Sequence, residues 1–419
     1  MKMRITDLLD DYFDDSVNLT LTEAPSETAE PVPELLPAAQ RETRGILRPA
    51  LVLAASLLLV VMAGAVGYFR LTAGAPESGL PLAEEGSVLL PPATEEPGPI
   101  GAYEATEDTV PAIEPPAPTE PPETVSPEEE AFFELFWELD RDSVKRYLAA
   151  HPEALEKGWE GLDINESGLD QNGTEMYTVY GDQVLAVNAA DGITLIRVWL
   201  SDNNTRGVLA ICKDTGRLSL CPAENLDVAG QTAGEICDGN GGVLAMTGSA
   251  FMDDGYANGG RLSGLAVCGG TVYGAPLGEA GDKRLELRED NRMYIVDSSN
   301  PLGEGTRDAC EFHPGLIIDG VIYYNDFWSS PNPRAVLGQS SRLEAMMVVT
   351  EGRLATSLGC GVDQISEKLA QYGCVQALNL DGGTSAMMYY KGQYVNRCSN
   401  TALPEGRALP TAWVYQPKG

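Results

Sequence analysis

The chain has 419 residues and a formal net charge of −34, and it contains no dense cluster of Lys and Arg. Because nucleic-acid backbones are bound by clustered basic side chains, the composition argues against a nucleic-acid-binding protein. The 43% hydrophobic content allows a sizeable core, whereas 28 Pro residues and the excess of acidic side chains predict that part of the chain is disordered.

Residues 1–48 carry ten acidic and five basic side chains, and only residues 5–13 have a short helical pattern. We interpret this segment as a mostly disordered, acidic cytoplasmic tail. Two interpretations remain open. The segment is either a solvated leader or a docking site for a cytoplasmic partner through Leu8, Leu9, Tyr12 and Phe13.

Residues 49–69 form a run of 21 residues without a charged side chain, between Arg48 and Arg70. At about 1.5 Å per helical residue this run is long enough to cross a bilayer, and a buried core helix is the alternative. Basic residues are more frequent on its N-terminal side, which by the positive-inside rule places the N-terminus in the cytoplasm. We therefore expect a single-pass membrane protein with its C-terminal part outside the cytoplasm.

Residues 70–127 are rich in Pro and Glu and are expected to be a disordered linker. The eight Cys residues all follow the predicted membrane segment, where oxidation is possible, but the sequence does not assign their pairing. The lack of a CxxC motif and the presence of only two His residues argue against a structural zinc site.

Residues 128–179 are predicted to form a small helical cap. Ser126 and Glu129 have the spacing of a capping box, and apolar residues continue the helical pattern behind them. A second short helix is expected before His151.

From residue 180 to 419, short β-type runs alternate with Gly-rich turns. One helix is expected to interrupt them, from Val362 to Tyr372, and Gly373 suits its left-handed end. The pattern predicts an α+β fold, with a mixed, largely antiparallel sheet and few helices, preceded by a single transmembrane helix and a disordered linker.

The segment after this helix combines an apolar strand with a polar loop. The strand runs from Val375 to Leu380, and the loop reads Asp381-Gly382-Gly383-Thr384-Ser385. This order places a carboxylate and two hydroxyls where backbone N–H groups can approach a ligand closely. A hairpin across Lys391-Gly392 should follow, with Arg397 near its end.

This segment, NLDGG-TS followed by a hydrophobic hairpin and Asn-Arg, resembles the signature of the phosphodiester glycosidase family. Three upstream stretches resemble further family elements in the same order: Gly234–Gly260 with its Asn-Gly-Gly turn, the FHPGLIIDGVI run, and Pro333–Gly338. The resemblance covers about residues 180–417. The chain departs from it at Thr247–Phe251, where many relatives have Asn-Gly-Gly-Phe-Phe, and at Ala335, where many have Thr.

The resemblance implies a hydrolase that removes a hexosamine-type sugar from a phosphodiester, here in cell-surface or exopolysaccharide glycans. Such a reaction needs a carboxylate near the anomeric carbon and Arg near the departing phosphate. The catalytic candidates are Asp381, Asn379, Arg334 and Arg397. The substrate-binding candidates are Gly382, Gly383, Thr384, Ser385, Asn258, Gly259 and His313.

Each candidate also has a purely structural interpretation. Asp381 would then cap its own loop, Asn379 would be a strand-end bulge residue, and either Arg would form an internal salt bridge. Thr384 and Ser385 would tie the loop together, Asn258 and Gly259 would form only a turn, and His313 would hydrogen-bond within a turn.

No cofactor is expected, although Asp253 and Asp254 form a loop carboxylate pair that suits either calcium, catalysis or a solvated surface. The departures from the family pattern support an alternative function, a non-catalytic glycan-binding or sensory ectodomain that signals to the cytoplasmic tail. A phosphodiesterase that cleaves the other P–O bond is a third hypothesis.

Overall fold

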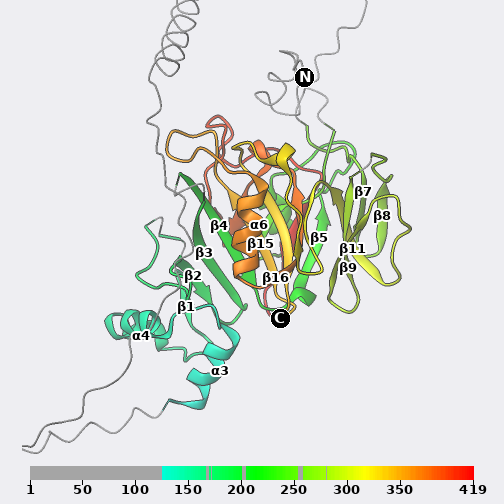
Figure 1. The fold of residues 1–419 in the computed structure, drawn as a ribbon. Coiled ribbons are helices and arrows are strands. Elements are labelled where there is room, and N and C mark those ends of the chain that lie inside the picture. The colour runs from blue at the N-terminus through cyan, green and yellow to red at the C-terminus, as the bar shows by residue number, and fades with distance from the viewer. Residues whose placement is uncertain (1–124, 167–168, 171, 201–203, 253–257, 280) are drawn as a thin grey trace, which may run out of the picture. The chain divides into compact units, whose positions relative to one another are not determined.

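The computed structural model describes residues 125–166, 169–170, 172–200, 204–252, 258–279 and 281–419 (Figure 1). The predicted tail, the predicted membrane helix and all but the last residues of the predicted linker lie outside these ranges. Within the ranges, none of the helices has the length and apolar character that crossing a bilayer requires.

Two short helices begin the described chain, α3 (Pro127–Leu135) and α4 (Arg141–Ala150). Ser126 caps α3 by accepting the Glu129 N–H at 3.1 Å, as predicted. The Glu129 carboxylate does not complete a capping box but lies 2.9 Å from Lys145 Nζ on α4. Phe132, Phe133 and Phe136 pack beneath the two helices into a separate apolar cluster.

The largest sheet has nine strands in the order β1-β2-β3-β4-β15-β14-β16-β12-β13. In chain order they are β1 (Asp163–Ile164), β2 (Gln183–Asn188), β3 (Ile193–Leu200), β4 (Thr205–Cys212), β12 (Gly315–Ile318), β13 (Val321–Ile322), β14 (Ala335–Ser340), β15 (Ala345–Thr350) and β16 (Cys374–Leu380). The cap contributes β1, which pairs with β2. Lys213, buried after β4, forms ion pairs with Glu138 of the cap at 2.7 Å and with Glu344 at 2.9 Å.

Two five-stranded sheets complete the domain, in the orders β10-β9-β11-β7-β8 and β18-β17-β6-β19-β5. The first contains β7 (Leu265–Cys268), β8 (Thr271–Gly274), β9 (Lys283–Arg288), β10 (Met293–Asp297) and β11 (Thr306–Phe312). The second contains β5 (Leu218–Pro222), β6 (Leu244–Thr247), β17 (Met388–Tyr390), β18 (Gln393–Tyr394) and β19 (Thr411–Tyr415). Each strand ladder in the described ranges is antiparallel, which confirms the predicted sheet-rich, largely antiparallel fold.

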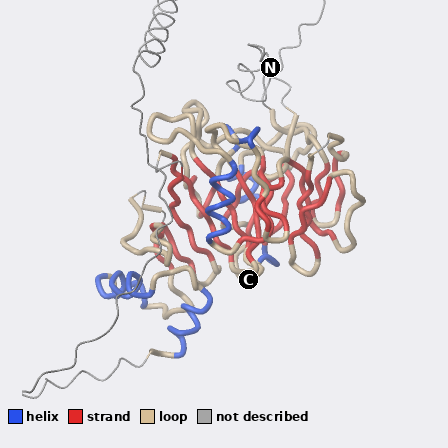
Figure 2. Tube along the Cα trace, viewed as in Figure 1, coloured by secondary structure: helices blue, strands red, loops and turns tan. Residues whose placement is uncertain are grey.

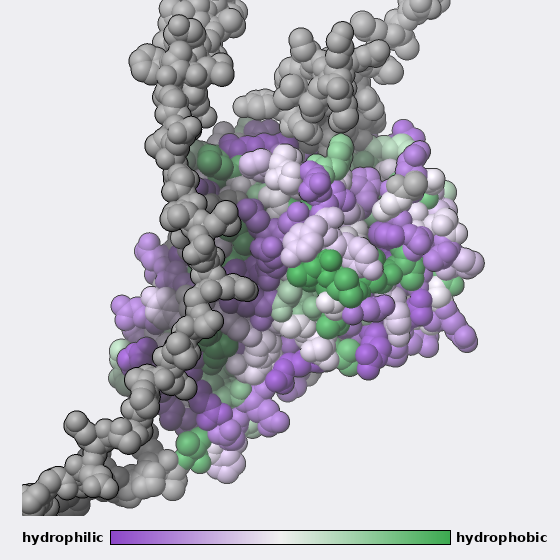
Figure 3. Space-filling view, in the orientation of Figure 1, coloured by the Kyte–Doolittle hydropathy of each residue, from purple (hydrophilic) through white to green (hydrophobic). Residues whose placement is uncertain are grey.

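The main core lies where the three sheets face one another, and it unites side chains such as Leu195, Leu285, Leu378 and Trp413. Helix α6 (Val362–Gln371) covers the other face of the large sheet, and α5 (Ala233–Gly239) packs against β6, β17 and β19. Figure 2 shows that strands form most of the domain and that α6 crosses the large sheet. The face drawn in Figure 3 is mainly hydrophilic with an apolar patch near its centre, in keeping with the acidic composition.

The predicted helix and its end are confirmed, because α6 stops before Gly373, which has a φ of +77°. The expectation of a single helix beyond residue 180 is wrong, since α5 forms at the start of the Gly234–Gly260 stretch. A complete capping box stabilises the start of this helix. The Thr232 hydroxyl accepts a hydrogen bond from the Glu235 N–H, and the Glu235 carboxylate accepts one from the Thr232 N–H at 2.8 Å.

Candidate active site

One edge of the large sheet gathers segments that are distant in the sequence. Register pairs Ala335 with Leu380 and with Val349, and Gly315 with Leu378, so β14 and β12 begin where β15 and β16 end. The residues just beyond these strand ends are His313, Arg334, Glu351 and Asp381. We call this the site edge. Its loops include those drawn in orange and red above the strands in Figure 1.

The Asp381 loop is fixed to the segment that carries Arg334. Gly383, with a φ of +58°, donates its N–H to the carbonyl of Pro333 at 3.1 Å. A Cβ on Gly382 would lie only 2.6 Å from the same oxygen, so this approach needs glycine. The loop then turns through η4 (Gly383–Ser385), in which Ser385 is buried. Asp381 and Arg334 are therefore neighbours across the β14–β16 pair.

Arg334 is only 4% exposed and binds the loops around it. Its Nη2 donates to the carbonyls of Ser330 at 3.0 Å and Trp328 at 3.3 Å, and its Nε donates to that of Cys360 at 3.3 Å. The guanidinium carbon also lies 5.1 Å from the centre of the Trp328 ring. Arg334 thus organises the site edge and brings a buried positive charge to it.

Arg397 reaches the same edge from beyond the β17–β18 hairpin. Its Nη2 lies 2.6 Å from Glu351 Oε2 and 2.8 Å from Thr356 Oγ1. The hydrogen bond with Glu351 raises the pKa of Arg397 and keeps the side chain charged. The Glu351 carboxylate is 3% exposed, whereas the Arg397 side chain is 49% exposed. Part of this guanidinium therefore faces solvent, where an anion can reach it.

Asn379 links β16 to the segment that precedes β12. Its backbone N–H donates to the carbonyl of Pro314 at 3.1 Å, and its Nδ2 donates to that of His313 at 2.8 Å. Its Oδ1 is buried and has no hydrogen-bond partner within the described part of the chain. Asn379 therefore holds His313 next to β16, the strand that ends just before Asp381.

The His313 ring contacts three side chains. Its Nδ1 lies 2.8 Å from Asp282 Oδ1, and its centre lies 5.0 Å from that of Phe312 and 5.3 Å from that of Trp328. Trp328, in η3 (Asp326–Trp328), thus touches both His313 and Arg334. Sequence reasoning did not identify Asp282, Trp328 or Glu351, because each lacks a local motif.

Asn258 and Gly259 lie in a tightly packed turn. The Gly230 N–H donates to the Asn258 carbonyl at 2.6 Å. A Cβ on Gly259, which has a φ of +61°, would lie 1.9 Å from the carbonyl oxygen of Ala408. These contacts join the turn to the segments before α5 and β19. Asp253 and Asp254, the predicted calcium candidates, lie outside the described residues.

The described residues contain no group of three or more His, Cys, Asp or Glu side chains suited to hold a metal ion. All eight cysteines fall within the described ranges as free thiols. Burial raises their pKa values, for example that of Cys221 to about 11 and that of Cys360 to about 11. A buried thiol with a raised pKa is a poor nucleophile, so the cysteines are not candidates for catalysis.

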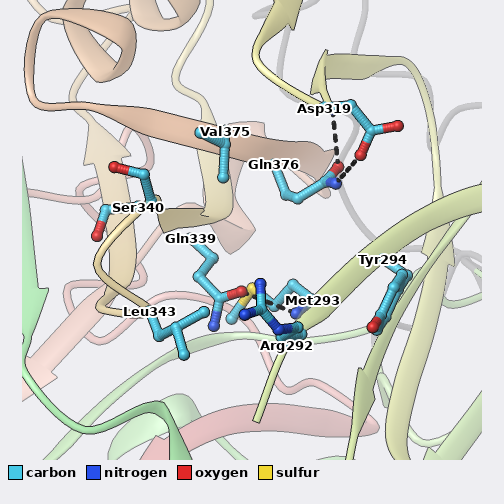
Figure 4. Close-up of a pocket in the computed structure, with 10 residues that line it drawn as sticks. Arg292, Met293, Tyr294, Asp319, Gln339, Ser340, Leu343, Val375 and Gln376 are labelled. Atoms are coloured by element: carbon cyan, nitrogen blue, oxygen red, sulfur yellow. Dashed lines mark hydrogen bonds between the residues drawn. The ribbon is translucent and has the colours of Figure 1, made fainter. Parts of the chain in front are cut away.

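A pocket of about 340 Å³ lies at the other end of β16, beside Val375 and Gln376 (Figure 4). Gln376 Nε2 donates to Asp319 Oδ1 at 2.6 Å, and Arg292 and Tyr294 also line the pocket. None of the candidate site residues lines it. It is therefore separate from the site edge.

Comparison with known proteins agrees with the sequence resemblance. Residues 240–416 match the sequence model of the family described as phosphodiester glycosidase. A curated relative, the SPbeta prophage-derived protein YomE of Bacillus subtilis, is 25% identical over 163 residues, which are 36% of this chain and 25% of the relative. The chain thus spans about a quarter of the length of that relative.

Three solved structures are similar at low sequence identity. The zebrafish N-acetylglucosamine-1-phosphodiester alpha-N-acetylglucosaminidase catalytic domain, auto-inhibited by its pro-peptide, is 15% identical with a TM-score of 0.44, covering 54% of this chain and 82% of that one. A hypothetical protein from Synechocystis is 13% identical with a TM-score of 0.40, covering 56% and 64%. A putative exported protein from Burkholderia pseudomallei is 14% identical with a TM-score of 0.39, covering 51% and 74%.

The matched residues contain every candidate site residue, together with Asp282, Trp328 and Glu351. Residues 240–416 of this chain are therefore a phosphodiester glycosidase domain.

Proposed function

We propose that the chain hydrolyses a sugar-1-phosphodiester of the hexosamine type. The observation that carries this proposal is the convergence of the Asp381 loop, Arg334 and Arg397 on one sheet edge within the phosphodiester glycosidase domain.

The chemistry of the substrate fits this set of groups. The leaving phosphate is already a stable anion, so strong acid assistance matters less than in an ordinary glycosidase. Positive charge develops at the anomeric carbon, and negative charge develops on the departing phosphate. We assign Asp381 to the sugar side, where its carboxylate orients the sugar hydroxyls and opposes the positive charge.

The two arginines have different surroundings and therefore different proposed roles. Arg397 is half exposed and is the group that contacts the phosphate directly. Arg334 is buried and donates to backbone carbonyls, so it contributes a fixed positive charge and holds the loop beside Asp381. The Thr384 hydroxyl then offers a hydrogen bond to a phosphate oxygen.

The proposed setting is the outer face of a membrane. The uncharged run of residues 49–69 would anchor the chain, and the Pro-rich linker would hold the domain away from the bilayer. Residues 1–48 would remain in the cytoplasm, where they are available to a partner. The substrate would then be a cell-surface or exopolysaccharide glycan. Protease digestion of intact cells tests this topology: digestion should remove the domain and spare an epitope tag at residue 1.

The activity is tested with purified full-length chain and a hexosamine-1-phosphodiester that has a small aglycone. We expect sugar release by the wild type and a loss of at least about 100-fold for Asp381→Ala, with an unchanged unfolding midpoint. Asp290→Ala is the matched control, because Asp290 lies in the β9–β10 turn, where it bonds with Tyr294 and Arg292. Binding of the substrate without turnover would favour the non-catalytic glycan-binding alternative.

A further inference from the structure

We infer that His313, oriented by Asp282, is the general base that activates the attacking water. This inference rests on the proposed hydrolysis and adds the catalytic group which that reaction still lacks. The observation behind it is the 2.8 Å contact between His313 Nδ1 and Asp282 Oδ1 at the site edge. In unrelated enzymes, the base that activates a nucleophile is often oriented by a carboxylate in this way.

Asp282 determines which ring nitrogen of His313 carries the proton. Its carboxylate is 5% exposed, and its Oδ2 accepts the Glu279 N–H at 2.9 Å. An ionised carboxylate can only accept hydrogen bonds, so the contact with Oδ1 requires a proton on His313 Nδ1. In the neutral imidazole, Nε2 then has a lone pair and can accept a proton from water.

The ring is also held in a fixed orientation and remains accessible. Phe312 stacks on it with an interplanar angle of 23°, and Trp328 packs against it at 54°. The side chain is still 41% exposed. A packed but accessible imidazole is suited to repeated exchange of a proton with solvent or substrate.

Two links connect this base to the rest of the proposed site. Asn379, near the end of β16, donates to the His313 carbonyl, and Asp381 is the first residue after that strand. Trp328 contacts the His313 ring and lies under the Arg334 guanidinium. The base therefore belongs to the same cluster as the proposed sugar and phosphate contacts.

In the proposed step, His313 Nε2 takes one proton from a water molecule while the water oxygen bonds to the anomeric carbon. The bond from that carbon to the phosphodiester oxygen breaks, and its electron pair leaves with the phosphate. The products are the free sugar and a phosphomonoester. The proton on Nε2 then returns to solvent, which restores the base.

The chain provides a matched control in its second histidine. His151, at the end of α4, lies 3.2 Å from Glu153 Oε1, and both side chains are exposed on the cap. It resembles His313 in having a carboxylate partner, but it lies elsewhere in the fold, and its partner Glu153 is 65% exposed whereas Asp282 is 5% exposed. Its replacement should not affect turnover.

The test compares the full-length wild type with His313→Ala, Asp282→Asn, their double variant and His151→Ala. We expect His313→Ala to lower kcat about 10²- to 10⁴-fold with KM nearly unchanged, and added imidazole to restore part of the rate. Asp282 acts through His313 as a positioning residue, so the double variant should be no slower than His313→Ala alone. His151→Ala should equal the wild type. If His313→Ala does not fold, His313→Gln replaces it.

Two outcomes would overturn the inference while leaving the proposed function intact. One is a His313 variant that folds and turns over within twofold of the wild type. The other is a double variant whose losses multiply and which imidazole does not rescue, because this result means that Asp282 does not act through His313 and that the missing group is not an imidazole base. A wild type that releases no sugar would instead refute the proposed function itself.

Discussion

Arg397 and Glu351 form an ion pair at the site edge, with Arg397 Nη2 2.6 Å from Glu351 Oε2. The Arg397 backbone N–H also donates to Glu351 Oε1, at 3.1 Å. The buried carboxylate thus fixes both the backbone and the side chain of a residue whose guanidinium is half exposed. This arrangement gives Arg397 a structural role and a proposed phosphate-binding role, and the two roles can be separated.

A double-mutant cycle separates them. We expect Arg397→Ala to destabilise the fold by about 1.5–3 kcal/mol, because Glu351 is left buried without its charged partner. Adding Glu351→Gln should recover part of that loss, since the buried charge is then removed. Both variants should still have a raised KM for the phosphodiester. Chemical denaturation and steady-state kinetics measure the two effects. A double variant with wild-type KM would contradict phosphate binding by Arg397.

The turn at Gly259 should tolerate no side chain. Gly259 and Gly241 both have positive φ, +61° and +66°, so Ala at either position is strained by about 1–2 kcal/mol. A Cβ would meet the Ala408 carbonyl only at Gly259, whereas nothing lies within 4 Å at Gly241. Gly259→Ala should therefore lose about 1–3 kcal/mol more than Gly241→Ala in urea denaturation. Equal losses of stability in the two variants would contradict this prediction, because they would show that the backbone at Ala408 moves away from the added Cβ at little cost.

Glu286 should make stability depend on pH. Burial by itself raises its pKa, but hydrogen bonds from Arg288, Arg284 and the Gly303 N–H outweigh burial and lower the pKa below its ordinary value. Because the pKa of Glu286 is lower in the folded state, its ionised carboxylate stabilises the fold at pH values above its unfolded-state pKa of about 4.3. This stabilisation is lost as the pH falls through the pKa of Glu286 in the folded state.

Glu286→Gln should therefore destabilise the domain by about 3 kcal/mol or more near neutral pH, and the difference from the wild type should shrink as pH falls below about 4. Denaturation curves at several pH values measure this difference. Glu289→Gln, an exposed neighbour, is the control and should differ little from the wild type at every pH. A stability difference between Glu286→Gln and the wild type that stays constant or grows with acidification would contradict the role assigned to Glu286.

Local patterns were sufficient to predict the elements around the Asp381 loop. The helical spacing of α6, its end at Gly373 and the apolar run of β16 agree with the structure. The hairpin turn also agrees, since Lys391 and Gly392 both have positive φ. These features depend on residues close in the sequence, so the sequence alone reveals them.

Contacts between distant segments were not predictable in this way. Asp282 and His313 are 31 residues apart, and Glu351 and Arg397 are 46 apart. Neither pair belongs to a repeating pattern, because each partner lies in a loop beyond a strand end. The sheet order brings such loops together, and that order depends on the whole antiparallel topology.

The most direct test of the central claim is hydrolysis by the full-length chain in water enriched in oxygen-18. Cleavage between the anomeric carbon and the phosphodiester oxygen predicts the label in the hydroxyl of the released sugar, and none in the phosphomonoester. Label in the phosphate would contradict glycosidic cleavage and favour a phosphodiesterase. Release of neither product from a folded chain would contradict the hydrolase account altogether.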